Sequence, residues 1–137
     1  MSAVLKLKKG DKKKIQSIAK EHIQYRKKRH PLEYPNAGSI FKNYDFRKIP
    51  KKLQNQFSHV VKTDPFPVVP TAYILSEAGV KGKKIGQAQI SEKHPNYIVN
   101  LDGAKAKDVI KLIRFVKEKI KKKFGISLEE EIQYVGD

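Results

Sequence analysis

The chain has 137 residues, of which 39% are hydrophobic and 32% charged, so it is long enough for one globular domain with its own core. Thirty lysines and arginines against fourteen acidic residues give a net charge of +16 and favour an anionic partner: nucleic acid, an anionic membrane surface or a phosphorylated small molecule. The lack of cysteine excludes disulfides and thiolate metal sites, and no apolar run is long enough for a signal peptide or a transmembrane helix, so we expect a cytoplasmic protein.

The N-terminal part of the chain is predicted to hold one long helix. Residues 3–8 alternate apolar and basic side chains, which is typical of a short edge strand. Asp11 then caps a helix that runs to about Arg29, where the His30-Pro31 pair ends it. The apolar members of this helix fall on one face: Ile15, Ile18, Ala19 and Ile23.

The middle of the chain mixes short helices and strands. Residues 50–61 can form a short helix, and the prolines of residues 63–70 indicate an ordered loop. Residues 71–78 are predicted to form a helix that is stopped by the glycine following it. Residues 84–90 and 97–101 are predicted to be strands.

The clearest predicted element is a helix over residues 104–124. Its apolar stripe consists of Val109, Ile113, Val116 and Ile120. Gly125 is its C-terminal stop, and the lysines of its last turn suit the negative end of the helix dipole. A final strand is predicted over residues 128–135. The fold class is therefore α+β, with a small mixed sheet packed against helices in a single domain that covers residues 1–137.

The residue pattern alone supports no strong catalytic or metal motif. The four histidines lack the spacing of metal ligands, so no metal site is predicted. No glycine-rich phosphate loop is present. A triad of Ser39, His94 and Glu131 can be assembled, but their positions in the sequence do not show that they meet.

A basic nucleic-acid-binding module is one alternative function. The lysines of residues 12–14 and 117–123 lie on predicted helices and could contact phosphates. However, no aromatic side chains are interleaved with them in a stacking pattern, and no RNA-recognition or zinc-finger signature occurs. Solvated lysines on helix faces explain the charge as well, so we do not expect nucleic acid to be the main partner.

The stretch PNAGSIFKN, residues 35–43, has the composition of a turn that presents a side chain. Proline and asparagine favour the turn, and Gly38 permits a backbone shape that a side chain would forbid. The next residue, Ser39, offers a hydroxyl, with Lys42 and Asn43 a few positions further on. We therefore expect this turn to hold the Ser39 hydroxyl in a fixed place.

Three stretches in this order resemble the C-terminal, substrate-binding domain of UDP-N-acetylmuramate dehydrogenase, also called UDP-N-acetylenolpyruvoylglucosamine reductase. They are PNAGSIFKN (35–43), AYILSEAGVKGKKIGQAQISEKHPNYIVN (72–100) and FGISLEEEIQYVG (124–136). The resemblance extends upstream through LKLKKGDKKKIQ and YRKKRHP, so it covers nearly the whole chain. It implies a role in peptidoglycan precursor synthesis for the cell wall.

The resemblance implies an oxidoreductase that converts UDP-N-acetylglucosamine enolpyruvate to UDP-N-acetylmuramate. In the family, NADPH reduces FAD, the flavin passes a hydride to the enolpyruvyl double bond, and a serine that corresponds to Ser39 protonates the neighbouring carbon. A glutamate of the family's terminal LEPE motif, which corresponds to Glu131, stabilises the enolate-like intermediate together with an arginine of the flavin domain. The proline of that motif is replaced by Glu130 in this chain.

The resemblance also implies a set of substrate-binding side chains, most of them cationic. They are Arg26, Arg29, Lys42, Asn43, Lys81 and His94. Cations that face a pyrophosphate are the physical expectation for such a substrate. In one branch of the family a tyrosine-bearing loop covers the nucleotide, and residues 44–70 form an insert of similar length, in which Phe66-Pro67 could replace the tyrosine.

The family holds FAD mainly on an N-terminal region that this sequence does not match. Residues 1–10 correspond to the end of that preceding FAD-domain region. We therefore expect the FAD-binding domain to lie on a missing N-terminal segment or a separate chain, and this chain alone to hold no FAD and to be inactive. A non-catalytic UDP-sugar-binding domain is the remaining alternative, and no membrane partner is expected.

Overall fold

The chain divides into two compact units, one up to residue 30 and one from residue 31 onward, in a computed structural model that describes residues 2–63 and 66–136. The first unit holds helix α1 (Lys12–Arg29), and the carboxylate of Asp11 accepts a hydrogen bond from the backbone N–H of Lys14 at 2.7 Å, as expected of an N-cap. No residue of α1 is buried. The strand predicted over residues 3–8 was wrong, because no strand among the described residues pairs with this segment.

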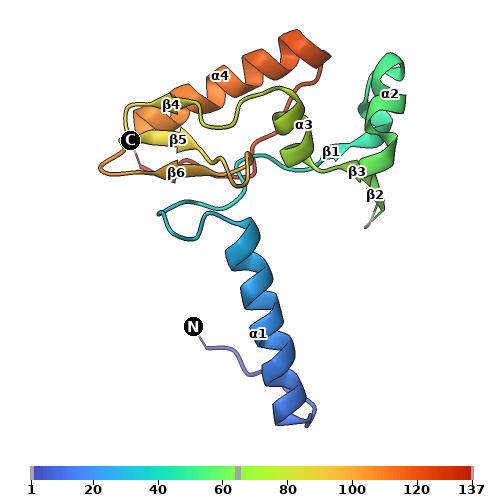
Figure 1. The fold of residues 1–137 in the computed structure, drawn as a ribbon, viewed down its shortest axis with the longest axis vertical. Helices are drawn as coiled ribbons and strands as arrows, with labels where there is room; N and C mark the ends of the chain where they lie inside the picture. The colour runs from blue at the N-terminus through green and yellow to red at the C-terminus, as the bar shows by residue number, and fades with distance from the viewer. Residues whose placement is uncertain (1, 64–65, 137) are drawn as a thin grey trace. The chain divides into compact units, whose positions relative to one another are not determined.

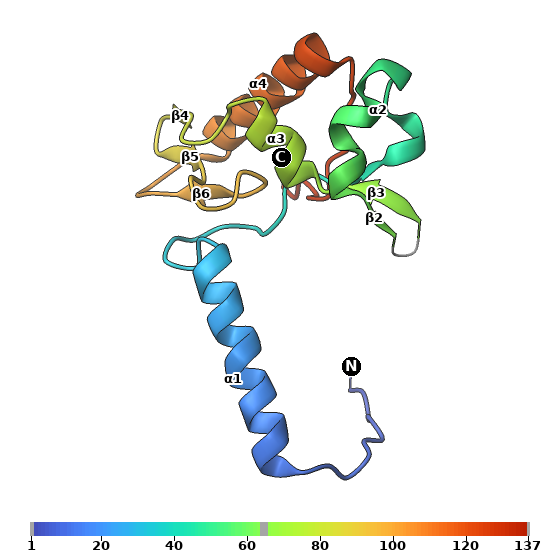
Figure 2. The same cartoon turned by 45° about the vertical axis from the view of Figure 1, so that its right-hand side comes forward.

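The second unit combines helices with two small antiparallel sheets (Figures 1 and 2). One sheet has the order β1 (Tyr44–Asp45), β3 (Pro67–Val69), β2 (Lys62–Thr63), and the other has the order β4 (Lys84–Ile85), β5 (Ala88–Ile90), β6 (Ile98–Asn100). The helices are α2 (Lys51–Phe57), α3 (Thr71–Glu77) and α4 (Ala106–Phe124), with short 3-10 turns η1 (Phe46–Lys48) and η2 (Ser58–Val60). The predicted α+β class is confirmed.

The strands differ from the prediction in their number and pairing. Two antiparallel sheets replace the single small mixed sheet, because β1 pairs only with β3 while β5 lies between β4 and β6. Residues 84–90 form a hairpin and not one strand, since Gly86, at φ 55°, allows the reversal between β4 and β5. Residues 128–135 form no strand and make only an isolated bridge, between Glu130 and Phe41. The segment 63–70, predicted to be a loop, contains strand β3, and its residues 64–65 lie outside the described residues.

Helix α4 carries the largest share of the hydrophobic core. It lies along the β4–β5–β6 sheet and also contacts α3 (Figure 1). Its buried side chains are Leu112, Ile113, Val116, Ile120 and Phe124. Three members of the predicted stripe are thus buried, and the fourth, Val109, packs against the edge of the core. Gly125, with φ 70°, ends the helix as predicted.

Several lysines of α4 contact the rest of the fold. The ammonium groups of Lys119 and Lys123 donate hydrogen bonds to the carbonyls of Gly79 at 3.1 Å and Glu77 at 2.5 Å, at the C-terminal end of α3. That end is the negative pole of a helix, so these cations stabilise it. Part of the positive charge is therefore structural. Within the described residues, no helix has the length and apolar character needed to cross a membrane.

Candidate functional site

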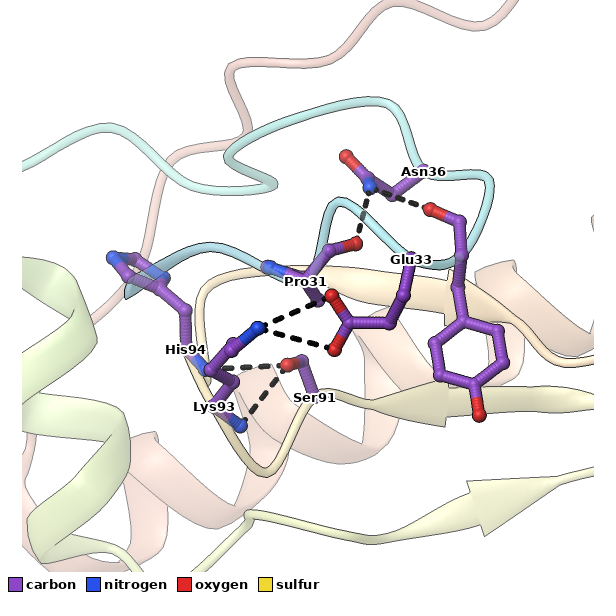
Figure 3. A network of polar contacts seen from close by, with 7 residues as sticks. Pro31, Glu33, Asn36, Ser91, Lys93 and His94 are labelled. Carbon is purple, nitrogen blue, oxygen red and sulfur yellow. Dashed lines mark hydrogen bonds and ion pairs between the residues drawn. The ribbon is translucent and has the colours of Figure 1, made fainter. Parts of the chain in front are cut away.

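Asn36 and Gly38 shape the turn that precedes Ser39. The side-chain amide of Asn36 donates hydrogen bonds to the carbonyls of Pro31 at 3.2 Å and Tyr34 at 2.9 Å (Figure 3). Its side-chain oxygen accepts a hydrogen bond from the N–H of Gly38 at 3.0 Å, and Gly38 has φ 82°. This is the left-handed backbone that glycine adopts without strain. The predicted turn is present, and Ser39, which follows it, is half-buried.

Asn96 holds the residues that follow Ser39 from one side. Its side-chain oxygen accepts a hydrogen bond from the N–H of Phe41 at 3.0 Å, and its amide donates to the Phe41 carbonyl at 2.8 Å. Its own carbonyl accepts from the N–H of Ile40 at 2.8 Å. Asn96 is only 3% exposed. Sequence reasoning missed it, although an asparagine between a proline and an apolar run is a signal for a buried polar contact.

The C-terminal glutamates hold the same residues from the other side. The N–H of Lys42 donates to the carbonyl of Glu129 at 3.0 Å, and the N–H of Glu131 donates to the carbonyl of Ile40 at 2.8 Å. Glu131, whose side chain is exposed, is therefore paired with the neighbour of Ser39. The structure thus brings together the two segments that carry the predicted catalytic residues.

Lys42 and Asn43 have structural partners. The ammonium group of Lys42 forms an ion pair with the carboxylate of Glu129, and this hydrogen bond holds the pKa of Glu129 below its usual value. The side-chain oxygen of Asn43 accepts a hydrogen bond from the N–H of Thr71 at 3.2 Å, and the Thr71 hydroxyl donates to the Lys42 carbonyl at 2.6 Å. Thr71 is the buried first residue of α3. Asn43 therefore helps to fix the start of that helix.

A cavity of about 420 Å³ lies beside Lys42 and Asn43. Its lining residues are Lys42, Asn43, Tyr44, Asp45, Lys48, Phe66, Ser127 and Glu129. Asp45 binds the guanidinium of Arg47 at 2.7 Å, and this hydrogen bond lowers the pKa of Asp45 to about 2. The same guanidinium lies 5.4 Å from the centre of the Phe66 ring. The cavity thus combines two lysines and two carboxylates with two aromatic side chains, so it offers both polar groups and a planar surface to a ligand.

His94 belongs to the connection between β5 and β6 that also carries Asn96. The Ser91 hydroxyl oxygen accepts hydrogen bonds from the N–H of Lys93 at 3.1 Å and of His94 at 3.2 Å, which curls this connection (Figure 3). The Lys93 ammonium binds the Glu33 carboxylate at 3.2 Å. A backbone hydrogen bond, followed by this contact with Lys93, lowers the pKa of Glu33. His94 therefore lies two residues from the Asn96 contact with the serine segment.

The other predicted binding residues lie on two further elements. Lys81 is exposed in the turn between α3 and β4, and no hydrogen bond or ion pair of the described residues links it to Ser39 or Glu131. Arg26 and Arg29 lie in the last turn of α1, in the first unit, where the Arg29 guanidinium lies 4.6 Å from the centre of a tyrosine ring. Their contact with substrate stays a prediction.

The paired segments carry a serine hydroxyl and a lysine on one side and glutamate carboxylates on the other. Ser39 can exchange a proton with a bound molecule, Glu131 can bind it by hydrogen bonding, and Lys42 can offer positive charge. Among residues 2–63 and 66–136, no group of three or more histidines, aspartates or glutamates could hold a metal ion.

The sequence is similar to those of known proteins. Residues 30–135 match the family model of the UDP-N-acetylenolpyruvoylglucosamine reductase C-terminal domain. The UDP-N-acetylenolpyruvoylglucosamine reductase of Fervidobacterium nodosum is 39% identical over 97% of the chain, and that of Clostridium tetani is 35% identical over 100% of it. The matches cover 36% and 38% of those two proteins, so the chain spans less than two fifths of their length.

A solved structure shares the fold. The crystal structure of the UDP-N-acetylenolpyruvylglucosamine reductase from Thermus caldophilus matches with a TM-score of 0.62 and 30% identity. The match covers 93% of this chain and 37% of that protein. The likeness in sequence and the likeness in structure therefore concern nearly the same share of the chain.

Proposed function

Because this chain belongs to the family of UDP-N-acetylenolpyruvoylglucosamine reductase C-terminal domains, we propose that it forms the substrate-binding part of such a reductase. It would bind UDP-N-acetylglucosamine enolpyruvate and contribute side chains to its reduction to UDP-N-acetylmuramate. The observation that carries this proposal is the pairing of Ile40 with Glu131, which brings the serine turn and the terminal glutamates side by side. Reaction in the cytoplasm stays a prediction.

Ser39 is the proposed proton donor. Reduction of a carbon–carbon double bond adds a hydride to one carbon and a proton to the other, so the second carbon needs a donor within reach. A serine hydroxyl is a poor acid in water, and its usefulness depends on a fixed position. The hydrogen bonds of Asn36 and Asn96 on either side of Ser39 support this role, because they restrict the backbone that carries the hydroxyl.

Glu131 is the proposed partner of the negative charge that develops on the substrate carboxylate. Glu131 would act there together with an arginine of the flavin-binding segment, because donors aimed at a developing negative charge stabilise it. Lys42 and Asn43 are the proposed contacts for the anionic part of the substrate, and the cavity of about 420 Å³ at these residues supports this role. His94, Lys81, Arg26 and Arg29 stay proposed contacts.

FAD and NADPH, the proposed redox groups of the complete enzyme, do not fit a site on this chain alone. Within the described residues, helices α3 and α4 begin at Thr71 and Ala106, and neither start has the glycine-rich turn that cradles a pyrophosphate. Of the positive-φ glycines next to helices, Gly79 and Gly125 follow helix ends, and Gly103 stands as a single glycine three residues before α4. We therefore assign flavin binding to a separate polypeptide segment, as in the longer relatives, and expect this chain alone to be inactive.

The first test is a titration of the chain with UDP-N-acetylglucosamine enolpyruvate, followed by amide NMR shifts at low and moderate salt. We expect saturable shifts at Ser39, Lys42 and Glu131 that persist at moderate salt. Binding of short nucleic acids that weakens steeply with salt, without any substrate shift at these residues, would favour the nucleic-acid alternative instead.

The second test uses the chain combined with a flavin-binding domain. We expect Ser39→Ala to slow reoxidation of the reduced flavin by roughly 10²–10⁴-fold, the usual contribution of a positioned acid. Ser58→Ala is the matched control, because the Ser58 hydroxyl donates only to the carbonyl of Asn55 on the surface. Reoxidation at an unchanged rate in Ser39→Ala would reject the proton-donor role.

A further inference from the structure

We propose that Glu130 is a positioning residue that ties the Glu131 segment to α4 through Lys117, with Tyr134 of the same terminal segment as its second partner. The carboxylate of Glu130 accepts a hydrogen bond from the Lys117 ammonium at 2.7 Å and from the Tyr134 hydroxyl at 2.5 Å. The catalytic importance of holding Glu131 rests on the proposed function. The tether itself rests on contacts within this chain.

The three consecutive glutamates turn to different neighbours. Glu129 pairs with Lys42 on the serine segment, whereas Glu130 pairs with Lys117 on α4. Successive side chains of an extended segment point to opposite faces, so Glu131 shares the face of Glu129 and not that of Glu130. Anchoring Glu130 to α4 therefore directs Glu131 toward the side on which Lys42 lies.

The surroundings of Glu130 distinguish it from its two neighbours. Its side chain is 20% exposed, against 73% for Glu129. It lines a cavity of about 490 Å³ between α4 and the terminal segment, together with Ile110, Ile113, Arg114, Lys117, Glu118 and Tyr134. Hydrogen bonds from Lys117 and Tyr134 lower the pKa of Glu130, and burial together with Glu130 raises the pKa of Tyr134 to about 12. The lower exposure of this ion pair means that water screens it less than the Lys42–Glu129 pair.

The backbone at Glu130 explains why a proline can stand at this position in the related motif. Phe41 and Glu130 face each other in an antiparallel bridge, but the hydrogen bonds on either side are made by Lys42 and Glu131. In such a pair the facing residues exchange no hydrogen bonds. Among the described residues, the Glu130 N–H has no acceptor, so its loss in a proline leaves the pairing intact. A proline restricts the backbone by its ring, whereas Glu130 restricts it by its side chain.

The test is amide hydrogen exchange on the whole 137-residue chain. The reporter is the Glu131 N–H, which donates to Ile40, and the reference is the Ile90 N–H, which donates to Lys83 in the β4–β5 hairpin. We expect Glu130→Ala to speed exchange of the reporter by roughly tenfold relative to the reference, the effect of losing charge-assisted hydrogen bonds. Lys117→Met and Tyr134→Phe should each increase the exchange rate of the Glu131 N–H by a smaller factor. These two variants replace Glu130→Ala in the test if that variant does not fold.

Two further variants separate positioning from general stability. Glu130→Pro should restore slow exchange of the reporter, although it removes the side-chain contacts. Glu118→Gln, which changes the same charge on the same cavity, should leave the reporter unchanged. Equal acceleration at Glu131 and Ile90, or no protection in Glu130→Pro, would overturn the proposal.

Activity is measured separately, in the chain combined with a flavin-binding domain. There Glu130→Ala should lower kcat by a larger factor than it raises KM, and Glu130→Pro should have a kcat close to that of the wild type. If Glu131→Gln left turnover unchanged while the exchange pattern held, the function proposed for Glu131 would fail and the tether would stand. If exchange did not respond to Glu130→Ala, the tether would fail whatever the activity.

Discussion

Helices α1 and α4 are both long and rich in lysine, yet only α4 is part of a core. They have 18 and 19 residues. Five residues of α4 are buried and none of α1 is. The apolar face predicted for α1 is present, but Ile15, Ile18 and Ile23 are 57%, 44% and 53% exposed.

The difference shows that a lysine-rich composition does not decide whether a helix packs against a core. In α4 the apolar residues form a continuous stripe that faces the β4–β5–β6 sheet, and Lys119 and Lys123 reach the carbonyls at the end of α3. In α1 the apolar residues are more widely spaced, so the stripe is narrow. A helix with so little burial gains little stability from tertiary packing.

The largest expected difference between the two helices is in hydrogen exchange. Interior amides of α4 should exchange only on global unfolding, whereas those of α1 should exchange through local fraying, at rates at least about 10³-fold faster. Mass-spectrometric or NMR exchange of the chain measures both in one sample. Equal protection in α1 and α4 would contradict the comparison.

The core side of the comparison can be tested with matched isoleucines. Ile120 is fully buried in α4. Ile120→Ala should lower the free energy of unfolding by about 2–5 kcal/mol. Ile18→Ala in α1 should change it by less than about 0.5 kcal/mol. Urea unfolding followed by tyrosine fluorescence gives both values, and a cost above 1 kcal/mol for Ile18→Ala would show that α1 is packed in solution.

Substitutions at the helix ends should change stability less than the loss of a buried isoleucine. Gly125→Ala forces a side chain into φ 70°, so it should cost about 1–2 kcal/mol, although the added methyl group meets no neighbour. Asp11→Ala removes the cap of α1 and should lower helix content near Lys14 without changing the unfolding midpoint of the second unit. Circular dichroism and urea unfolding separate these outcomes.

The smallest expected effect is that of the ion pair between α4 and the terminal segment. Lys117→Met should cost at most about 1 kcal/mol at pH 7. The pKa of Glu130 is lower in the folded chain than its ordinary value of 4.5, so its contribution is complete above that value and is lost as pH falls through the lowered pKa. The gap between wild type and Lys117→Met should therefore narrow in acid. A gap that stays constant down to pH 3 would exclude Glu130 as the partner that matters.

The helices could be predicted because their signals are local. Asp11 and Gly125 mark the start of α1 and the end of α4, and the 3.6-residue apolar period marks the buried face of α4. The strands were harder, because they have only two or three residues and pair across long stretches of sequence. Residues 128–135 alternate like a strand, but a strand requires a partner of matching length, and Phe41 supplies only one bridge.

The sequence by itself determined the family, the turn around Gly38 and the identity of the residues proposed for chemistry. Only the tertiary structure decided how these residues are held. Asn96 reaches Phe41 across 55 positions, and Lys117 rather than a nearer cation pairs with Glu130. The physical reason is that turns and caps depend on neighbours along the chain, whereas these contacts exist only after the core has closed and brought distant segments into hydrogen-bonding distance.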